Sequence, residues 1–254
     1  MTDAAAIIRF VDVGMGFGKL QVFDNLRLDV REGEIITLLG GSGCGKSVLL
    51  KMILGLLHWQ SGAVLVDGDD ISDYDEAQML AVRRKVGMLF QNGALFDSLS
   101  VYENLAYPLR ERGATDEPAI AKRAAEVLEM VGLPGVEEKM PAELSGGMRK
   151  RVALARAISV APKVLLYDEP TTGLDPINVR RISELILDLN HRLKVTSICV
   201  THDLASAYMI SDRLAMIAER RVIAVGPTAE LRKSEDPTVK QFLTAMDLPG
   251  SRAA

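Results

Sequence analysis

The eight residues at 40–47 constrain the fold of this chain more than any other part of its sequence. They fit the pattern G-x-x-x-x-G-K-[ST], a glycine-rich loop that binds phosphate. The apolar run at 35–39 predicts a buried strand before the loop, and residues 48–54 predict a helix after it. A simple glycine-rich turn, the alternative interpretation, needs neither flank. The loop residues are Gly40, Gly41, Ser42, Gly43, Cys44, Gly45, Lys46 and Ser47.

Each part of this loop has a chemical use toward phosphate. Glycines let successive backbone N–H groups point at one anion. The helix that begins near Val48 adds free N–H groups and the positive end of its dipole. We expect Lys46 to reach the terminal phosphates and the Ser47 hydroxyl to bind Mg²⁺.

Length and composition exclude several classes of protein. A chain of 254 residues can bury one substantial core. A net charge of −4 lacks the positive footprint of a dedicated nucleic-acid binder, so we expect no nucleic-acid partner. Two cysteines do not make a disulfide framework, which favours a reducing compartment. Residues 1–5 do not resemble the start of a signal peptide, and no apolar run approaches the roughly 18 residues of a membrane span. We expect any membrane role to come through a partner.

Polar residues follow three predicted strands. The run at 86–90 leads to Gln91, the run at 164–167 to Asp168 and Glu169, and the run at 195–200 to His202. In open α/β sheets, ligands bind beyond the carboxyl ends of the strands. A lone histidine is more often structural, but this shared position predicts that His202 contacts phosphate.

The acidic pair is hard to explain by stability, since carboxylates are rarely buried without a partner. With a phosphate loop elsewhere in the chain, Asp168 fits a Mg²⁺ ligand. Glu169 fits a residue that orients or deprotonates an attacking water molecule.

The pattern turns helical from about residue 101, and one helix face carries apolar residues from Ile120 to Val131. A further helix opens at Ser145, Gly146 and Gly147, where serine is a good N-cap. Its uncovered N–H groups predict a second anion site that has no lysine of its own. The basic run at 149–151 is either a solvated helix face or a source of extra attraction to phosphate.

The remaining elements are strands at 7–13, 22–30 and 63–66, helices at 75–84 and 239–246, and a closing hairpin at 214–225. A loop is predicted at 14–18, where Phe17 either packs on the core or stacks on a purine base. Asp175 can cap the helix that Pro176 begins.

These motifs, in this order, resemble the nucleotide-binding domain of ABC (ATP-binding cassette) ATPases over nearly the whole chain. The resemblance implies six functional elements: Walker A at 40–47, the Q-loop at Gln91, the signature at 144–148, Walker B at 164–169, the D-loop at 173–175 and the switch histidine His202. It makes Phe17 the adenine-stacking aromatic and Glu169 the catalytic glutamate, with Lys46, His202 and Gln91 as further catalytic residues. Nucleotide contacts at Val48, Ser145, Gly146, Gly147 and Asp175, and Mg²⁺ ligation by Ser47, Gln91 and Asp168, follow from the same resemblance.

The implied fold is an α/β P-loop NTPase with a mixed β core, an antiparallel β subdomain and an inserted α-helical subdomain. We expect one domain over 1–254. Its core is placed at about 1–91 and 162–227, its helical subdomain at about 97–160 and its tail at about 228–254. ATP and Mg²⁺ are the implied cofactors. A second copy of the chain is the implied partner, with the signature of one copy capping the ATP held by the other.

The signature ends in Met148, where the family usually has glutamine. Together with the segments 88–96, 104–110 and 236–243, this departure resembles the ATPase subunit of MCE-type (Mla) lipid transporters. That subfamily implies phospholipid cargo, a permease pair, an MCE-domain subunit and, in some systems, a small STAS-domain protein. It also implies a place on the cytoplasmic face of the bacterial inner membrane, held through the permease.

Two questions stay open at this stage. A subunit that powers import of an amino acid or ion is the alternative to a lipid transporter, whereas a DNA-repair ATPase would split the cassette with a long coiled coil. The apolar loop at 92–96 either docks the permease or folds back onto the helical lobe.

Overall fold

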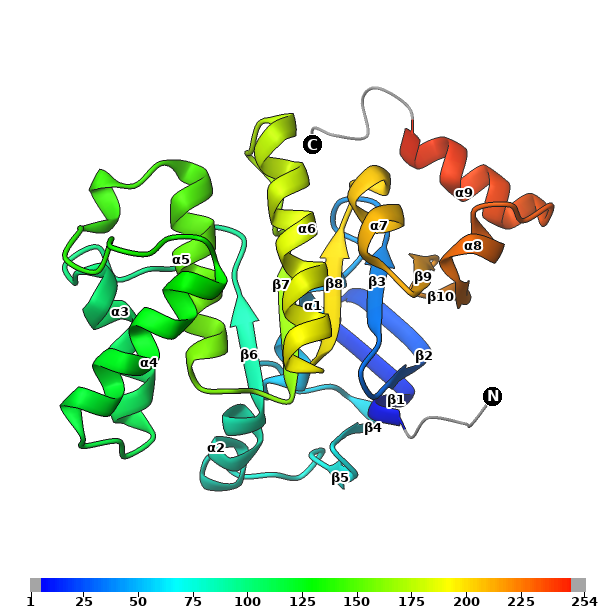
Figure 1. Cartoon of the computed structure of the whole chain (residues 1–254). Helices are drawn as coiled ribbons and strands as arrows, with labels where there is room; N and C mark the ends of the chain where they lie inside the picture. Colours follow the sequence, from blue (N-terminus) through cyan, green and yellow to red (C-terminus); the bar gives the residue numbers. More distant parts are fainter. Residues whose placement is uncertain (1–5, 248–254) are drawn as a thin grey trace.

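The computed structural model describes residues 6–247, so the ends of the predicted domain, 1–5 and 248–254, lie outside the described residues. Its strands form two sheets (Figure 1). The four-stranded antiparallel sheet has the order β2-β1-β4-β5 and the six-stranded sheet the order β10-β9-β3-β8-β7-β6. The strands are β1 Ala6–Phe17, β2 Leu20–Arg31, β3 Ile35–Leu39, β4 Ser61–Val66, β5 Asp69–Asp70, β6 Val86–Leu89, β7 Val164–Asp168, β8 Thr196–Thr201, β9 Arg213–Ala218 and β10 Arg221–Pro227.

Five neighbouring strands of the large sheet, β9, β3, β8, β7 and β6, run parallel, and β10 is antiparallel at the edge. Every residue of β3, β7 and β8 is buried, as expected for strands covered on both faces. Their register pairs Leu39 with Thr201 and Asp168 with Val200. The strands therefore end together, and the loops that follow them start at one edge of the sheet.

The helices, including one 3₁₀ turn, cover both faces of this sheet. They are α1 Lys46–Ile53, α2 Glu76–Lys85, α3 Val101–Glu111, α4 Glu117–Met130, η1 Pro141–Glu143, α5 Gly146–Ser159, α6 Pro176–Leu193, α7 Leu204–Ile210, α8 Thr228–Leu231 and α9 Pro237–Asp247. In Figure 1, α3, α4 and α5 form a separate group beside β6, and α6 lies across the sheet.

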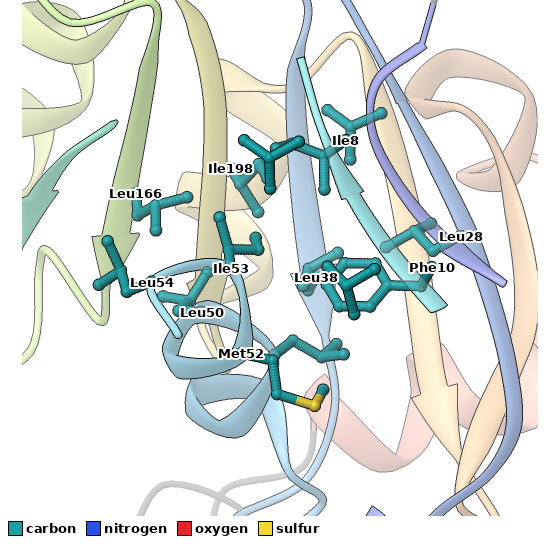
Figure 2. Packing of buried hydrophobic residues seen from close by; sticks show 14 of the residues in the cluster. Ile8, Phe10, Leu28, Leu38, Leu50, Met52, Ile53, Leu54, Leu166 and Ile198 are labelled. Atoms are coloured by element: carbon teal, nitrogen blue, oxygen red, sulfur yellow. The ribbon is translucent and has the colours of Figure 1, made fainter. Parts of the chain in front are cut away.

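Alternate residues of the central strands feed two different cores. Leu166 and Ile198 face α1, which is packed between the two sheets (Figure 2). Leu165 and Tyr167 face the opposite way and join a core built from α3, α4, α5 and α6. This alternation follows from the period of two along a strand. The two cores thus pack against opposite faces of the central strands.

The predicted loop at 14–18 is wrong, because β1 continues through Phe17. Met15 pairs with Phe23 and Phe17 pairs with Leu20, with register shifts along the pairing. Bulges of this kind let a glycine-rich segment stay in a ladder while its twist increases. The tail also holds the short helix α8, which the sequence did not predict.

Candidate phosphate-binding site

The loop at 40–47 has the tight backbone that its glycines predict. Gly45 is the N-cap of α1 and has a φ of 99°, a left-handed conformation that favours glycine. A Cβ atom on Gly40 would lie 2.4 Å from Sγ of Cys44 and 2.9 Å from the carbonyl oxygen of Ile217. No side chain caps α1, so its first N–H groups stay open to an anion.

Lys46 is buried in the first turn of α1. Its ammonium donates hydrogen bonds to the carbonyl oxygens of Gly40, at 2.8 Å, and Gly41, at 3.0 Å. The positive charge is therefore held across the loop by neutral acceptors. A phosphate is a stronger acceptor than a peptide carbonyl and can take over these bonds.

The first residue after Lys46 meets the end of β7. The Ser47 hydroxyl donates a hydrogen bond to the carboxylate of Asp168 at 2.7 Å. These two oxygens suit Mg²⁺, which usually takes one or two protein ligands and completes its shell with phosphate and water. Within residues 6–247 no cluster of three or more His, Cys, Asp and Glu side chains could hold a metal. The residues present therefore fit a metal that arrives with a phosphate ligand.

Glu169 follows Asp168 and has an unusual backbone, with a φ of 48°. Its amide donates to the carbonyl of Val200 at 2.9 Å, which ties the loop to β8. Its carboxylate accepts from the hydroxyls of Thr172, at 3.1 Å, and Thr201, at 3.3 Å. Nδ1 of His202 lies 3.0 Å from the same carboxylate. Because a carboxylate only accepts hydrogen bonds, Nδ1 carries the hydrogen.

Gln91 lies after β6, the edge strand of the sheet, and its side chain is exposed. Its backbone carbonyl accepts a hydrogen bond from the ammonium of Lys150, which comes from α5. Burial lowers the pKa of the Lys150 amine, and the nearby Glu169 and Asp168 carboxylates oppose that shift. The solvated-face interpretation of the run 149–151 is therefore wrong for Lys150.

The predicted helix start with Ser145 as N-cap is present at α5. The Ser145 hydroxyl accepts from the amide of Met148 at 3.3 Å, and Ser145 and Gly146 are exposed. A Cβ atom on Gly147 would lie 2.9 Å from Oδ1 of Asn178 in α6. The Asn178 side chain also donates to Asp175, which lowers the pKa of that carboxyl.

Asp175 is the N-cap of α6, with Pro176 at the first helical position, as the sequence predicted. Phe17 lies at the tip of the β1–β2 hairpin and is 46% exposed, which contradicts the alternative that it packs on the core. Hydrogen bonds thus join Ser47 to Asp168 and Glu169 to His202. Ser145, at the start of α5, and Phe17, in the antiparallel sheet, lie on other elements of the molecule.

Sequence reasoning missed the residues that hold Glu169. Thr172 and Thr201 act through hydroxyls that form no motif. Lys150 had one available signal, because it precedes Ala153, Leu154 and Ala157 at helical spacing on a buried face.

No helix within residues 6–247 is both long enough and apolar enough to cross a membrane. The family model described as "ABC transporter" matches residues 23–172. "Intermembrane phospholipid transport system ATP-binding protein MlaF" of Haemophilus influenzae is 45% identical over 226 residues, 89% of this chain and 86% of that protein. The protein of the same name from Escherichia coli K12 is 40% identical over 241 residues, 95% and 90% of the two chains.

A further relative has a different name. "Probable ribonucleotide transport ATP-binding protein mkl" of Mycobacterium leprae is 42% identical over 227 residues, 89% of this chain. The matched region spans 65% of that protein, slightly under two thirds of its length.

Two solved structures have the same fold. A dimeric ATP-binding cassette, MJ0796, in a post-hydrolysis state with ADP and Pi, has a TM-score of 0.80 and 32% identity, and covers 87% of this chain and 98% of that one. CbiO1 of Clostridium perfringens, part of the ABC transporter complex CbiONQ, has a TM-score of 0.82 and 30% identity, and covers 94% and 98%. The predicted P-loop α/β fold is confirmed. With a family model that matches more than half of its length, this chain belongs to the ABC transporter family.

Proposed function

We propose that this chain is the ATP-hydrolysing subunit of a bacterial ABC transporter that moves phospholipid. The observation that carries the hydrolytic part is the Glu169 carboxylate, held by His202, Thr172 and Thr201 beside the Ser47–Asp168 pair. A fixed acceptor next to a phosphate loop is what removal of a proton from water needs. The family membership and the ADP and Pi in the MJ0796 structure support this activity.

Each residue has a proposed role. The loop at 40–48 binds the phosphates of ATP, with Lys46 exchanging its carbonyl partners for phosphate oxygens. Ser47, Asp168 and Gln91 hold Mg²⁺, which supplies charge neutralisation on the phosphates. Glu169 orients and deprotonates the attacking water. His202 fixes the Glu169 carboxylate through Nδ1, and its other ring nitrogen remains for phosphate.

We propose that two copies share their sites. The start of α5 at Ser145, Gly146 and Gly147 offers helix N–H groups that this chain's own phosphate loop does not use, and Ser145 and Gly146 are exposed there. An open cavity of about 760 Å³ lies beside His202 and is lined by residues 171–174 with parts of α6 and α7. The MJ0796 cassette is described as dimeric, which supports a second copy as the occupant of this face. In this dimer Asp175, the N-cap of α6, lies beside the same cavity and so near the shared nucleotide.

The same proposal covers the architecture and the nucleotide base. Residues 1–91 and 162–227 act as the core, residues 97–160 as the helical subdomain and residues 228–254 as the tail. Phe17, exposed at a hairpin tip, stacks on the adenine ring.

The cargo follows from the relatives. Two relatives named for intermembrane phospholipid transport match over nearly their whole length, which supports phospholipid. A permease, an MCE-domain subunit and a STAS-domain protein are the proposed partners, at the cytoplasmic face of the inner membrane. The name of the mycobacterial relative favours the second candidate, a transporter of a small polar solute, although the chain spans less of that protein.

The cargo is tested in proteoliposomes that contain this chain and the membrane protein that co-purifies with it. We expect ATP-dependent movement of a fluorescent phospholipid, abolished by Glu169→Gln. Stimulation of ATP hydrolysis by a nucleotide, amino acid or ion, with no lipid movement, would support the polar-solute transporter instead.

A further inference from the structure

Lys150 connects the helical layer, the group formed by α3, α4 and α5, to the loops that follow strands β6 and β7. It lies in the second turn of α5 and is only 7% exposed. Its ammonium donates to the backbone carbonyl of Gln91 and, at 3.4 Å, to that of Glu169. Gln91 and Glu169 follow β6 and β7, which are parallel neighbours in the sheet. One side chain therefore fastens two strand-end loops to each other and to α5.

The two neighbouring cations on α5 make a different kind of contact. Arg149 donates to the carbonyl of Leu144, and Arg151 donates to the carbonyls of Val131 and Gly132. Both bond within the helical layer, whereas Lys150 reaches the core. A buried ammonium is costly to desolvate, and a methionine of similar length would fill the same space without that cost. The contacts that Lys150 makes in the site are the reason for its position.

Glu169 needs this kind of support. A glutamate at a φ of 48° is strained, and such residues persist only where their surroundings fix them. Its amide is bonded to Val200, its carboxylate to His202, and its carbonyl to Lys150 and to the amide of Thr172 at 3.3 Å. Lys150 is the contact in this set that also holds Gln91.

We propose that Lys150 is a positioning residue for ATP hydrolysis, which fixes the predicted Mg²⁺ ligand Gln91 relative to the predicted base Glu169. The inference rests on the proposed function, because it takes its meaning from those two roles. It also gives α5 two tasks. Ser145, about 7.5 Å along the helix axis from Lys150, meets the nucleotide of the second copy, while Lys150 sets the geometry of this chain's own site.

The test is Lys150→Met in the full chain, measured in two ways. The first readout is the Mg²⁺ concentration that gives half of the thermal stabilisation by ATP, in a Glu169→Gln background without turnover. The second is kcat and KM for ATP in the otherwise unmodified chain. Loss of a residue that orients a metal ligand costs about 10- to 100-fold. We expect a rise of that size in the Mg²⁺ requirement and a similar fall in kcat, with KM for ATP changed less than about twofold. Lys150→Arg should restore most of both.

Arg151→Met is the matched control. Arg151 is on the same helix as Lys150 and also donates to two backbone carbonyls, but those carbonyls belong to Val131 and Gly132, away from the site. We expect it to lower the melting temperature while the Mg²⁺ requirement of the folded protein stays unchanged. If Lys150→Met does not fold, Lys150→Leu, which also has no donor, carries the same expectation.

A folded Lys150→Met or Lys150→Leu protein with an unchanged Mg²⁺ requirement and kcat overturns the inference, as does a loss that Arg151→Met reproduces in full. The proposed function is judged separately by Glu169→Gln. If that variant hydrolyses ATP at the normal rate, the assigned base is wrong, whatever Lys150 does.

Discussion

Two helices of this chain, α1 and α5, begin at glycine-rich stretches, and they differ in how their first N–H groups are covered. Gly45 caps α1 in a left-handed conformation, without a side-chain hydrogen bond. Ser145 caps α5 and binds the amide of Met148. Lys46 of α1 turns back across its own loop, whereas Lys150 of α5 turns inward to the strand ends. The start of α1 thus has a buried lysine beside it for a phosphate, whereas the buried lysine of α5 is bonded to Gln91 and Glu169.

The difference supports the proposal that one helix start forms a site within the chain and the other completes the site of a second copy. A dipole with open N–H groups and a buried ammonium can hold several phosphate charges. A capped helix start with one exposed glycine, Gly146, can contribute a few hydrogen bonds to an anion that is already held. The variants below test this contrast, from the largest expected effect to the smallest.

Lys46→Ala should have the largest effect, because it removes the cation from the complete site. We expect ATP binding and hydrolysis to fall by at least about 100-fold, since a charge-assisted bond to each of two phosphates is lost. Nucleotide affinity is measured by titration calorimetry, and hydrolysis by phosphate release. Lys51→Ala, an exposed lysine on the same helix, is the control and should behave as the unmodified chain. Normal hydrolysis by Lys46→Ala would mean that the loop does not bind the terminal phosphates.

Glu169→Gln should separate binding from chemistry at that same site. The amide keeps the size of the side chain and can still bond the two threonine hydroxyls, but it cannot take a proton from water. We expect ATP affinity within about threefold of the original, and a kcat lower by roughly 10²–10⁴. Single-turnover hydrolysis and equilibrium binding give the two values, with exposed Glu111→Gln as the control. Weakened ATP binding with unchanged turnover would exclude a catalytic role for Glu169.

Sharing between copies is tested by mixing two inactive chains. Lys46→Ala damages the α1 site, and Ser145→Arg blocks the α5 start, so each should inactivate its own homodimer. In a heterodimer purified with two different tags, one composite site carries both defects and the other carries neither. We expect ATP hydrolysis to recover to about half of the original, the share of one intact site of two. If verified heterodimers stay inactive, either the start of α5 does not serve the partner's nucleotide or the two sites must fire together.

The phosphate loop could be predicted from the sequence, whereas the different environments of the basic residues on α5 could not. Glycine spacing and apolar strands predicted the phosphate loop, because both depend on local geometry. The run Arg149–Lys150–Arg151 shows where prediction from the sequence failed. The three adjacent side chains are all cations, yet each has different partners in the structure. Only the packing of α5 against the sheet decides which of them is buried. The continuation of β1 through Phe17 was missed for a similar reason, because pairing with β2 outweighed the glycines.

The loop at 92–96 was predicted either to dock the permease or to pack on the helical lobe. Its two large side chains differ in burial. Leu95 packs against the core of the helical layer, whereas Phe96 is 43% exposed. The Phe96 ring lies edge-on to Tyr107 with centroids 5.1 Å apart, and the Arg156 guanidinium is 5.9 Å from its centroid. Arg156 and buried Asn104 also bond the loop backbone, which fixes the loop while leaving one face of Phe96 to solvent. Packing onto the helical lobe therefore holds for Leu95, and the docking prediction now rests on Phe96.

Phe96→Asp should therefore have the smallest effect on the isolated chain. We expect the unfolding free energy to fall by about 1 kcal/mol, because Phe96 is already 43% exposed and loses only its contacts with Tyr107 and Arg156. Leu95→Asp should cost about 2–4 kcal/mol, since it places a charge against an apolar core. ATP hydrolysis by folded Phe96→Asp should stay within about twofold, while co-purification of the membrane partner should be lost. Urea unfolding and affinity purification measure the two effects, with Phe96→Tyr as the control that keeps the ring. A stable Phe96→Asp chain that still binds its membrane partner and supports transport would exclude Phe96 from docking. The contact with the membrane partner would then lie elsewhere on α3, α4 and α5.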